Sequence, residues 1–152
     1  MNKRLFSIGL ALVLGAGYSL TAFSQAKPAT LVKQREAAMT LQGKYFGPMA
    51  AMAQGKVPFN AAAVARNAGY LEALSHMAWD GFDPSTSGEK SRALPAIYSD
   101  AGKFKAAQDA FQANVAKLVA ATKGGDEAAI KAAIGAVGKD CGNCHDNFRQ
   151  KQ

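Results

Sequence analysis

The segment from Asp126 to Arg149 constrains the fold of this chain more than any other, because it is amphipathic and also carries both cysteines. Asp126 is a suitable N-cap for a helix. After it, apolar side chains recur in alternating steps of four and three residues, the spacing of one helix face: Ile130, Ile134, Val137, Cys141, Cys144 and Phe148. The cysteines therefore continue the stripe that faces the core, and we expect whatever they bind to lie inside the protein.

The two cysteines belong to the motif Cys141-Gly-Asn-Cys144-His145, the attachment signature of c-type haem. Residues three apart on a helix point to one side, so two thiols can reach the two vinyl groups of one porphyrin. His145 can then offer an imidazole nitrogen to the iron. The sequence therefore predicts one haem, covalently attached through Cys141 and Cys144, with His145 as its proximal iron ligand.

Three other uses of these cysteines compete with haem attachment. A structural zinc site needs four ligands, and Cys141, Cys144, His145 and His76 supply that number. However, the side chains of Cys144 and His145 diverge on a helix. A thioredoxin-like dithiol would follow a strand, whereas this motif ends a long alanine-rich segment. A structural disulfide would leave the histidine unexplained, so the haem interpretation is favoured.

Residues 1–26 have the pattern of a secretory signal peptide, with Lys3 and Arg4 before an apolar stretch from Leu5 to Leu14. Cleavage is expected after Ser24 or after residue 26. The apolar stretch is too short for a comfortable membrane span, so we expect no membrane span in the mature chain, residues 27–152. Export agrees with a covalent haem, which is normally attached outside the cytoplasm, and the predicted location is the bacterial periplasm.

The charge balance argues against a nucleic-acid partner. The chain has a formal net charge of +7, and loss of the two basic residues of the signal leaves +5. No basic cluster stands out, and export removes the protein from nucleic acid. A mild excess of positive charge is typical of a solvated surface or of a surface that docks partner proteins.

Four helical segments separated by breakers are predicted after the signal, and no useful stretch alternates with the period of a strand. A Thr30 cap begins the first, which ends near residue 53 and which Pro48 is expected to kink or split. Asn60 caps the second, which extends towards Ala78. A polar loop, 80–94, separates it from the third, which begins at Pro95 or Ser99 and ends at residues 124–125. With the cysteine-bearing segment, these predict an all-α, antiparallel four-helix bundle with the haem in its core.

The sequence resembles a known family, the class II cytochromes c, which comprise cytochrome c′ and its low-spin relatives. The similarity covers essentially all of the mature chain. Its supporting pieces are Arg35-Glu-Ala-Ala-Met39-Thr-Leu41, Tyr45-Phe46-Gly47, Gly55-Lys-Val-Pro58-Phe59, Trp79-Asp-Gly-Phe82, Pro95-Ala-Ile97-Tyr98-Ser-Asp100 with Phe104, and Cys141-Gly-Asn-Cys144-His145-Asp-Asn-Phe148-Arg149. The resemblance implies a four-helix bundle with one covalent haem, His145 on its proximal side and the first helix over its distal face.

The resemblance also assigns positions around the haem. It places Met39 at the distal position, where low-spin members of the family use a methionine sulfur as sixth ligand and cytochrome c′ keeps a residue that blocks the iron without bonding to it. Arg35 and Glu36 match positions near the haem edge and its propionates, and a guanidinium suits a propionate. Glu89, in the polar loop, is a further candidate for a contact with the haem edge. Arg149 lies one helical turn after the proximal histidine and matches a basic residue beside the proximal face.

Two functions follow as hypotheses. The first is a periplasmic one-electron carrier that exchanges electrons with other redox proteins through Fe(III)/Fe(II) haem; it would not be an enzyme, because the distal candidate is a thioether and not an acid or a base. The second is a protein that binds NO or CO at an open sixth site gated by Met39. A homodimer is a further hypothesis, which small residues off the main stripes, such as Ala38, Ala50 and Ala65, favour.

Overall fold

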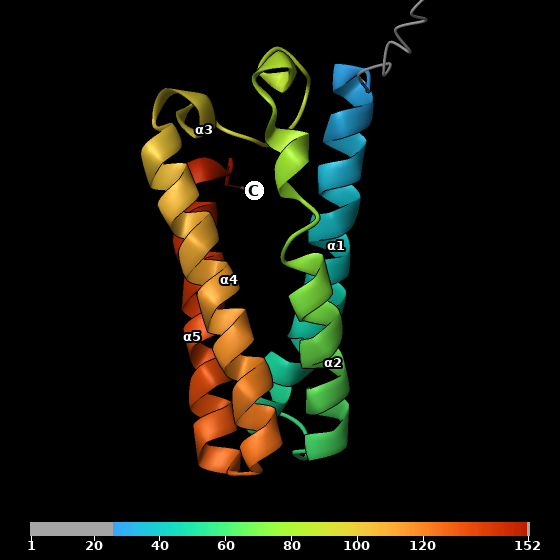
Figure 1. The fold of residues 1–152 in the computed structure, drawn as a ribbon, viewed down its shortest axis with the longest axis vertical. Coiled ribbons are helices and arrows are strands. Elements are labelled where there is room, and N and C mark those ends of the chain that lie inside the picture. Colours follow the sequence, from blue (N-terminus) through green and yellow to red (C-terminus); the bar gives the residue numbers. More distant parts are fainter. Residues whose placement is uncertain (1–25, 152) are drawn as a thin grey trace, which may run out of the picture.

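The computed structural model describes residues 26–151, and four long helices form its body (Figure 1). These are α1 (Pro28–Ala53), α2 (Ala61–Leu74), α4 (Ala101–Gly124) and α5 (Glu127–Phe148). Two short 3₁₀ helices, η1 (Trp79–Phe82) and η2 (Pro84–Thr86), and the single turn α3 (Ala96–Ser99) lie between α2 and α4. The predicted antiparallel four-helix bundle is confirmed. The predicted signal peptide lies outside the described residues, apart from residue 26.

Two of the predicted helix caps are confirmed. The side chain of Asn60 accepts a hydrogen bond from the backbone N–H of Ala63 at the start of α2. Asp126 does the same for Ala128 at the start of α5. Each cap satisfies one of the backbone donors that the first turn of a helix leaves free. Gly125, with φ of 76°, provides the left-handed residue that ends α4.

Three predicted helix details are wrong. Helix α1 begins at Pro28 and not after a Thr30 cap, because proline at the first helical position is already in the helical conformation and needs no N–H partner. The same helix runs through Pro48 without a break, so the predicted split is wrong, while a kink at Pro48 stays a prediction. Helix α2 ends at Leu74, four residues before the predicted Ala78, because the chain turns there into η1. The apolar residues up to Ala78 are therefore spaced as on a helix but lie in a turn.

The contact between Phe46 on α1 and Gly138 on α5 divides the bundle into two halves. The lower half, formed by the residues that follow Phe46 on α1 and precede Gly138 on α5, is packed with aliphatic side chains. A Cβ atom added to Gly138 would lie 3.3 Å from Cζ of Phe46, so the two helices are in close contact at this point. Below the contact, a continuous core joins all four long helices through Met49, Val64, Leu71, Leu118, Ile130, Ile134 and Val137, all of them fully buried.

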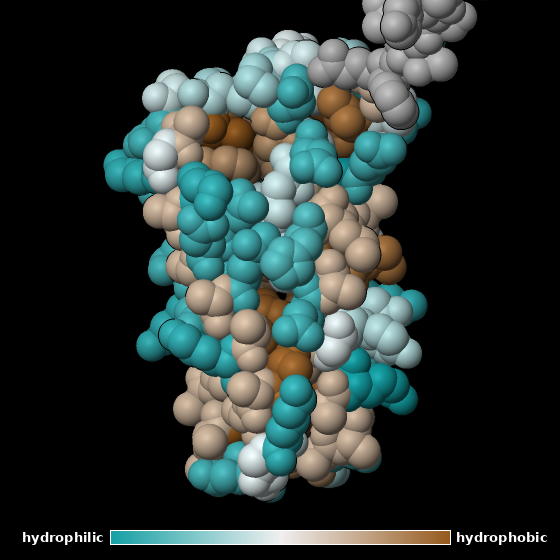
Figure 2. Space-filling view, viewed as in Figure 1, coloured by the Kyte–Doolittle hydropathy of each residue, from teal (hydrophilic) through white to brown (hydrophobic). Residues whose placement is uncertain are grey.

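Polar side chains cover most of the face seen in Figure 2, with apolar side chains visible between them. Among residues 26–151, no helix has both the length and the apolar character that crossing a membrane requires. Of the small residues considered for a dimer surface, Ala38 is only 7% exposed and packs inside the single chain. It is therefore not available to a second copy, and the homodimer stays a prediction.

Candidate functional site

The upper half of the bundle contains a cavity of about 400 Å³ between α1 and α5, which is partly open to solvent. The cavity and the packed core lie on opposite sides of the Phe46–Gly138 contact. The cavity begins about one helical turn from this contact, near Gln42 and Cys141. Helix α5 and its C-cap residue contribute Asp140, Cys141, Cys144, His145, Phe148 and Arg149 to its wall. Helix α1 contributes Arg35, Glu36, Met39, Thr40 and Gln42, and the remaining wall comes from α4 and the segment 79–97.

The register of the two helices places Met39 opposite His145. Helices α1 and α5 run in opposite directions (Figure 1). Met39 precedes Phe46 by seven residues, and His145 follows Gly138 by seven residues. At roughly 1.5 Å per helical residue, both side chains lie about 10 Å from the contact point and therefore at the same level. A planar group attached to α5 beside His145 would have Met39 across from it.

The two thiols are free and half-buried in the cavity wall. Burial raises the pKa of Cys141 to about 11, with smaller contributions from the negative charges of Asp140 and of Cys144. Burial also raises the pKa of Cys144, while the nearby Arg149 acts in the opposite direction. Both side chains are therefore protonated thiols near neutral pH, and neither is a reactive thiolate.

His145 is held as a neutral imidazole by its surroundings. Burial lowers its pKa, and the positive charges of Arg149 and Arg92 lower it further, against a smaller opposite effect of Asp146. The neutral form is the one that ligates a metal. The position of His145 in the cavity wall therefore suits it to an iron ligand.

Arg35 is a buried cation, 3% exposed, and its hydrogen bonds within the described residues all go to neutral acceptors. Its guanidinium donates to the carbonyl of Gly81 at 2.7 Å, to Thr86 Oγ1 at 2.9 Å and to Ser91 Oγ at 2.8 Å, with a longer contact to Tyr98. No carboxylate among residues 26–151 forms an ion pair with it. A buried charge without a counter-charge is costly, so this site favours an anionic group of a ligand.

Arg35 also fastens the 79–91 segment to α1. The chain passes so close at Gly81 that a Cβ atom there would lie 2.6 Å from Cβ of Arg35 and 2.8 Å from the carbonyl oxygen of Leu31. Only glycine permits this approach. The ring of Phe82 then lies under the guanidinium, 4.6 Å from Cζ to the ring centroid, an arrangement that stabilises the cation.

A short antiparallel bridge borders the cavity beside His145. It pairs Ala93 with Arg149. The N–H of Leu94 donates to the carbonyl of Phe148 at 2.9 Å, and the N–H of Gln150 donates to the carbonyl of Arg92 at 2.8 Å. The end of α5 is therefore tied to the same connecting segment that Arg35 ties to α1.

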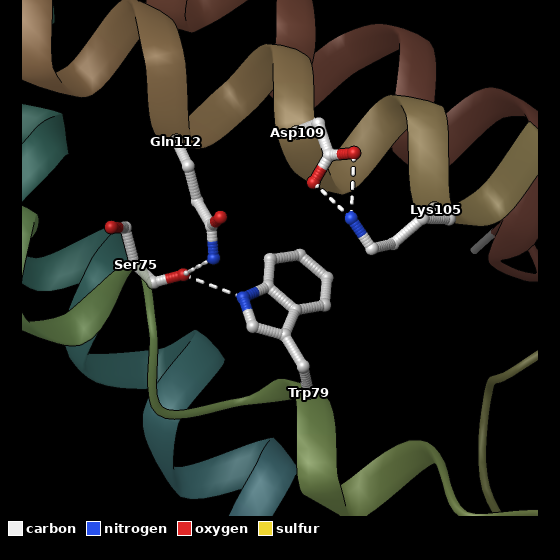
Figure 3. A network of polar contacts seen from close by, with 5 residues as sticks. All are labelled: Ser75, Trp79, Lys105, Asp109 and Gln112. Carbon is white, nitrogen blue, oxygen red and sulfur yellow. Dashed lines mark hydrogen bonds and ion pairs between the residues drawn. The ribbon is translucent and has the colours of Figure 1, made fainter.

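Aromatic rings form the wall nearest α4. Trp79 contacts Phe82, Phe104 and Phe111, with ring centroids 5.9 to 6.4 Å apart. The indole N–H of Trp79 and the amide of Gln112 both donate to the backbone carbonyl of Ser75 (Figure 3). These bonds fix the ring at the point where α2 gives way to η1, so Trp79 contributes a rigid apolar surface to the cavity.

The structure gathers seven of the eight predicted site residues in the wall of one cavity: Arg35, Glu36, Met39, Cys141, Cys144, His145 and Arg149. The prediction for Glu89 is not supported, because its side chain does not line the cavity. The turn of η2 and the bond from Arg35 bring Ser91 to the wall in its place. His76 is exposed at the end of α2 and lies outside the cavity, so the four-ligand zinc set is not assembled.

Five polar wall residues were not predicted from the sequence: Thr40, Gln42, Ser91, Arg92 and Asp140. A pattern does exist for Gln42, because it lies three residues after Met39 and seven after Arg35, on one helix face. Its amide donates to the carbonyl of Leu74 at 2.9 Å. Asp140 was identifiable only as the neighbour of Cys141.

The donor set of this cavity fits haem c. It offers two thiols three residues apart, a neutral imidazole beside them and a buried guanidinium suited to the acidic edge of a porphyrin. Aromatic and aliphatic side chains, among them Trp79, Phe82 and Phe104, form much of the remaining wall and suit the apolar face of a porphyrin.

Comparison with known proteins agrees with this fit. Residues 30–149 match the family model described as Cytochrome C′. The cytochrome c′ of Rubrivivax gelatinosus is 48% identical over 126 residues, which cover 82% of this chain and 98% of that protein. The cytochrome c′ of Alcaligenes xylosoxydans xylosoxydans is 43% identical over 127 residues, 84% of this chain and 98% of that one.

Solved structures show the same similarity. The crystal structure of the Rubrivivax gelatinosus cytochrome c′ superposes with a TM-score of 0.78 at 47% identity, covering 82% of this chain and 98% of that one. A nitric oxide complex of a variant Alcaligenes xylosoxidans cytochrome c′ gives 0.77 at 43%, covering 84% and 99%. A carbon monoxide complex of another variant gives 0.76 at 44%, covering 83% and 98%. The chain belongs to the cytochrome c′ family, and it is a haem c cytochrome.

Proposed function

We propose that this protein is a periplasmic monohaem cytochrome that carries single electrons between redox proteins. The observation that carries the proposal is the single cavity in which α5 presents Cys141, Cys144 and His145 opposite Met39 of α1. When bound, haem supplies a one-electron Fe(III)/Fe(II) couple and, where its sixth position is open, a site for a small neutral ligand. The residues of the chain decide which of these properties is used.

The two thiols would hold the cofactor covalently. Each thiol would form one thioether bond to a vinyl carbon of the porphyrin, and the thiol hydrogen would go to the other carbon of the same vinyl group. The raised pKa values of Cys141 and Cys144 mean that both enter this addition as thiols. His145 would supply the proximal imidazole, and Arg35 would neutralise a propionate from its buried position.

The packing around the cavity supports electron transfer. Arg35 and the bridge at Ala93 and Arg149 tie the connecting segment to both facing helices, and Trp79 is fixed by its bond to Ser75. A wall held in this way rearranges little when the charge in the cavity changes. The proposal makes the protein a carrier and not an enzyme, because the group at the level of His145 on α1, the thioether of Met39, is neither an acid nor a base.

Gas binding is the second candidate. It is favoured by the position of Met39 at the same level as His145 on the facing helix. A methionine there can either ligate the iron or only block access to it. The NO and CO complexes of the Alcaligenes xylosoxidans variants support this possibility for a chain about 43% identical to them. In this case the protein would take up NO or CO, and Met39 would act as a steric gate.

The experiment that tests both functions is the absorption spectrum of the purified periplasmic protein, oxidised and reduced, with and without CO. A haem c spectrum is expected in either case, and its absence would overturn both proposals. A reduced low-spin spectrum that CO does not change would mean that Met39 ligates the iron and that electron transfer is the function. A high-spin spectrum that shifts with CO would support gas binding.

A further inference from the structure

Asp140 places a carboxylate in the cavity wall directly before the first haem-binding cysteine. It lies on α5, is half-buried, and lines the cavity together with Cys141. None of the ion pairs within residues 26–151 includes it. The other acidic side chain in the wall, Glu36, is exposed. Asp140 is therefore the least solvated negative charge of this wall.

Asn114 holds this carboxylate from the neighbouring helix. The amide Nδ2 of Asn114, on α4, donates to Oδ2 of Asp140 at 2.7 Å. The other end of the same amide accepts from the ammonium of Lys117 at 3.4 Å. Because an amide has distinct donor and acceptor ends, the Lys117 contact turns the donor end towards Asp140. Lys117 contacts the amide of Asn114 and not the carboxylate of Asp140. The carboxylate is therefore held in place without forming an ion pair.

The negative charge of Asp140 influences the ionisation of a group in the cavity wall. Burial is the main cause of the raised pKa of Cys141, and Asp140 is the next contribution. The arginines of the wall, Arg35, Arg92 and Arg149, have the opposite sign. A half-buried charge is screened by salt much less than an exposed one.

We propose that Asp140, positioned by Asn114, lowers the reduction potential of the haem in this cavity. The inference rests on the proposed function, because it concerns the cofactor that the cavity would hold. Reduction adds one electron from an external one-electron donor and lowers the positive charge in the cavity by one. A fixed carboxylate beside the cavity stabilises the more positive, oxidised form, so Asp140 opposes the effect of the three arginines. Asn114 is a positioning residue that acts through Asp140.

The test is an equilibrium redox titration of the haem-loaded protein with mediators of known potential, followed by absorption. Asp140→Asn removes the charge and keeps the shape. We expect the ratio of Fe(II) to Fe(III) at a fixed mediator potential to rise by about three- to tenfold, where tenfold corresponds to about 59 mV for one electron. The control is Asp109→Asn, which removes an equal charge from an exposed carboxylate that is paired with Lys105 and does not line the cavity (Figure 3). The control shift should be smaller and should disappear at high salt, whereas the Asp140 shift should persist.

A double-mutant cycle separates positioning from structural damage. Asn114→Ala frees the carboxylate to turn towards water, and we expect a smaller rise in potential than for Asp140→Asn. In the Asp140→Asn background, Asn114→Ala should change the potential no further. The inference is overturned if Asp140→Asn carries haem but shifts the potential no more than Asp109→Asn, or if Asn114→Ala shifts it equally in both backgrounds. A wild-type protein without haem would overturn the proposed function itself.

Discussion

The two halves of the bundle use the same helices for opposite purposes. Below the contact between Phe46 and Gly138, the facing stripes of α1 and α5 meet through Met49, Ile134 and Val137 in a continuous buried core. Above it, the same stripes continue as Met39 and the two cysteines and leave a cavity. The difference teaches that an amphipathic stripe specifies which face turns inward, but it does not specify whether that face is filled by protein or by a ligand.

The halves also differ in what holds them together. The lower half is stabilised by buried aliphatic side chains that fill space. The upper half is held by polar connections at its edges: the bonds of Arg35 to the 81–91 segment and the bridge between Ala93 and Arg149. Substitutions in the lower core should therefore mainly change stability, and substitutions in the cavity wall should mainly change what the cavity binds.

The largest effect is expected from removing both attachment points in the upper half. The double substitution Cys141→Ala and Cys144→Ala should abolish covalent haem retention. The measurement is haem staining after denaturing electrophoresis, with wild type as the positive control. Haem that stays attached to the double variant would contradict the assignment of the two thiols.

The second largest effect concerns the reactivity of the Cys141 thiol before haem is attached. Its pKa is raised from 9.0 to about 11, so it stays protonated to higher pH in the native chain than in the unfolded one. At pH 8, where the thiolate is the minor form in both states, alkylation of the haem-free chain should be about 100-fold slower than in urea.

The measurement is the rate of reaction with iodoacetamide between pH 7 and 11, in a Cys144→Ala background so that one thiol is followed. In urea the rate should level off above about pH 10, whereas in the native chain it should keep rising towards pH 11. Equal profiles in the two states would show that the cavity does not protect the thiol.

The third prediction sets one substitution from each half against the other. Leu118→Ala, in the fully buried lower core, should cost about 2–5 kcal/mol of unfolding free energy and leave the CO response unchanged. Met39→Ala, in the cavity wall, should cost about 1 kcal/mol and change the CO response. Urea unfolding and CO difference spectra measure the two effects. If Leu118→Ala altered CO binding as much as Met39→Ala, the proposed division of the bundle would be wrong.

The smallest effect is expected at the edge of the cavity. Gly81→Ala should cost about 1–3 kcal/mol, because the new methyl group would meet Arg35 and Leu31 at distances that force the connecting segment away from α1. Gly88→Ala is the matched control, since it lies in the same segment and a Cβ there would have no neighbour within 4 Å. Comparison of the two urea midpoints checks the prediction, and equal midpoints would speak against a close docking at Gly81.

Much of the fold was accessible from the sequence because its signals are local. Helix caps at Asn60 and Asp126 and the three- and four-residue steps of α5 depend only on neighbouring residues. The end of α2 was missed because apolar residues continue to Ala78 through a non-helical turn. Local spacing cannot distinguish a helix from a turn whose side chains are buried by another part of the chain.

The site was accessible only in part, for a different physical reason. Cys141, Cys144 and His145 carry their chemistry in their spacing. Met39 and Arg35 required the family resemblance, because one methionine or arginine on a helix has no distinctive spacing. Asp140 and Gln42 line the cavity through the packing of helices distant in sequence, which no local pattern contains.

The contact between Phe46 and Gly138 has a further consequence for changes in chain length. From this point, α1 and α5 each run seven residues to Met39 and His145. One residue inserted between positions 39 and 46 would rotate Met39 by about 100° around its helix and shift it by about 1.5 Å, which takes it off the cavity face. An insertion of the same size at the Gly124–Gly125 turn would leave both distances unchanged. The two seven-residue segments should therefore keep their length when this protein diverges or is redesigned, while the turn between α4 and α5 is free to vary.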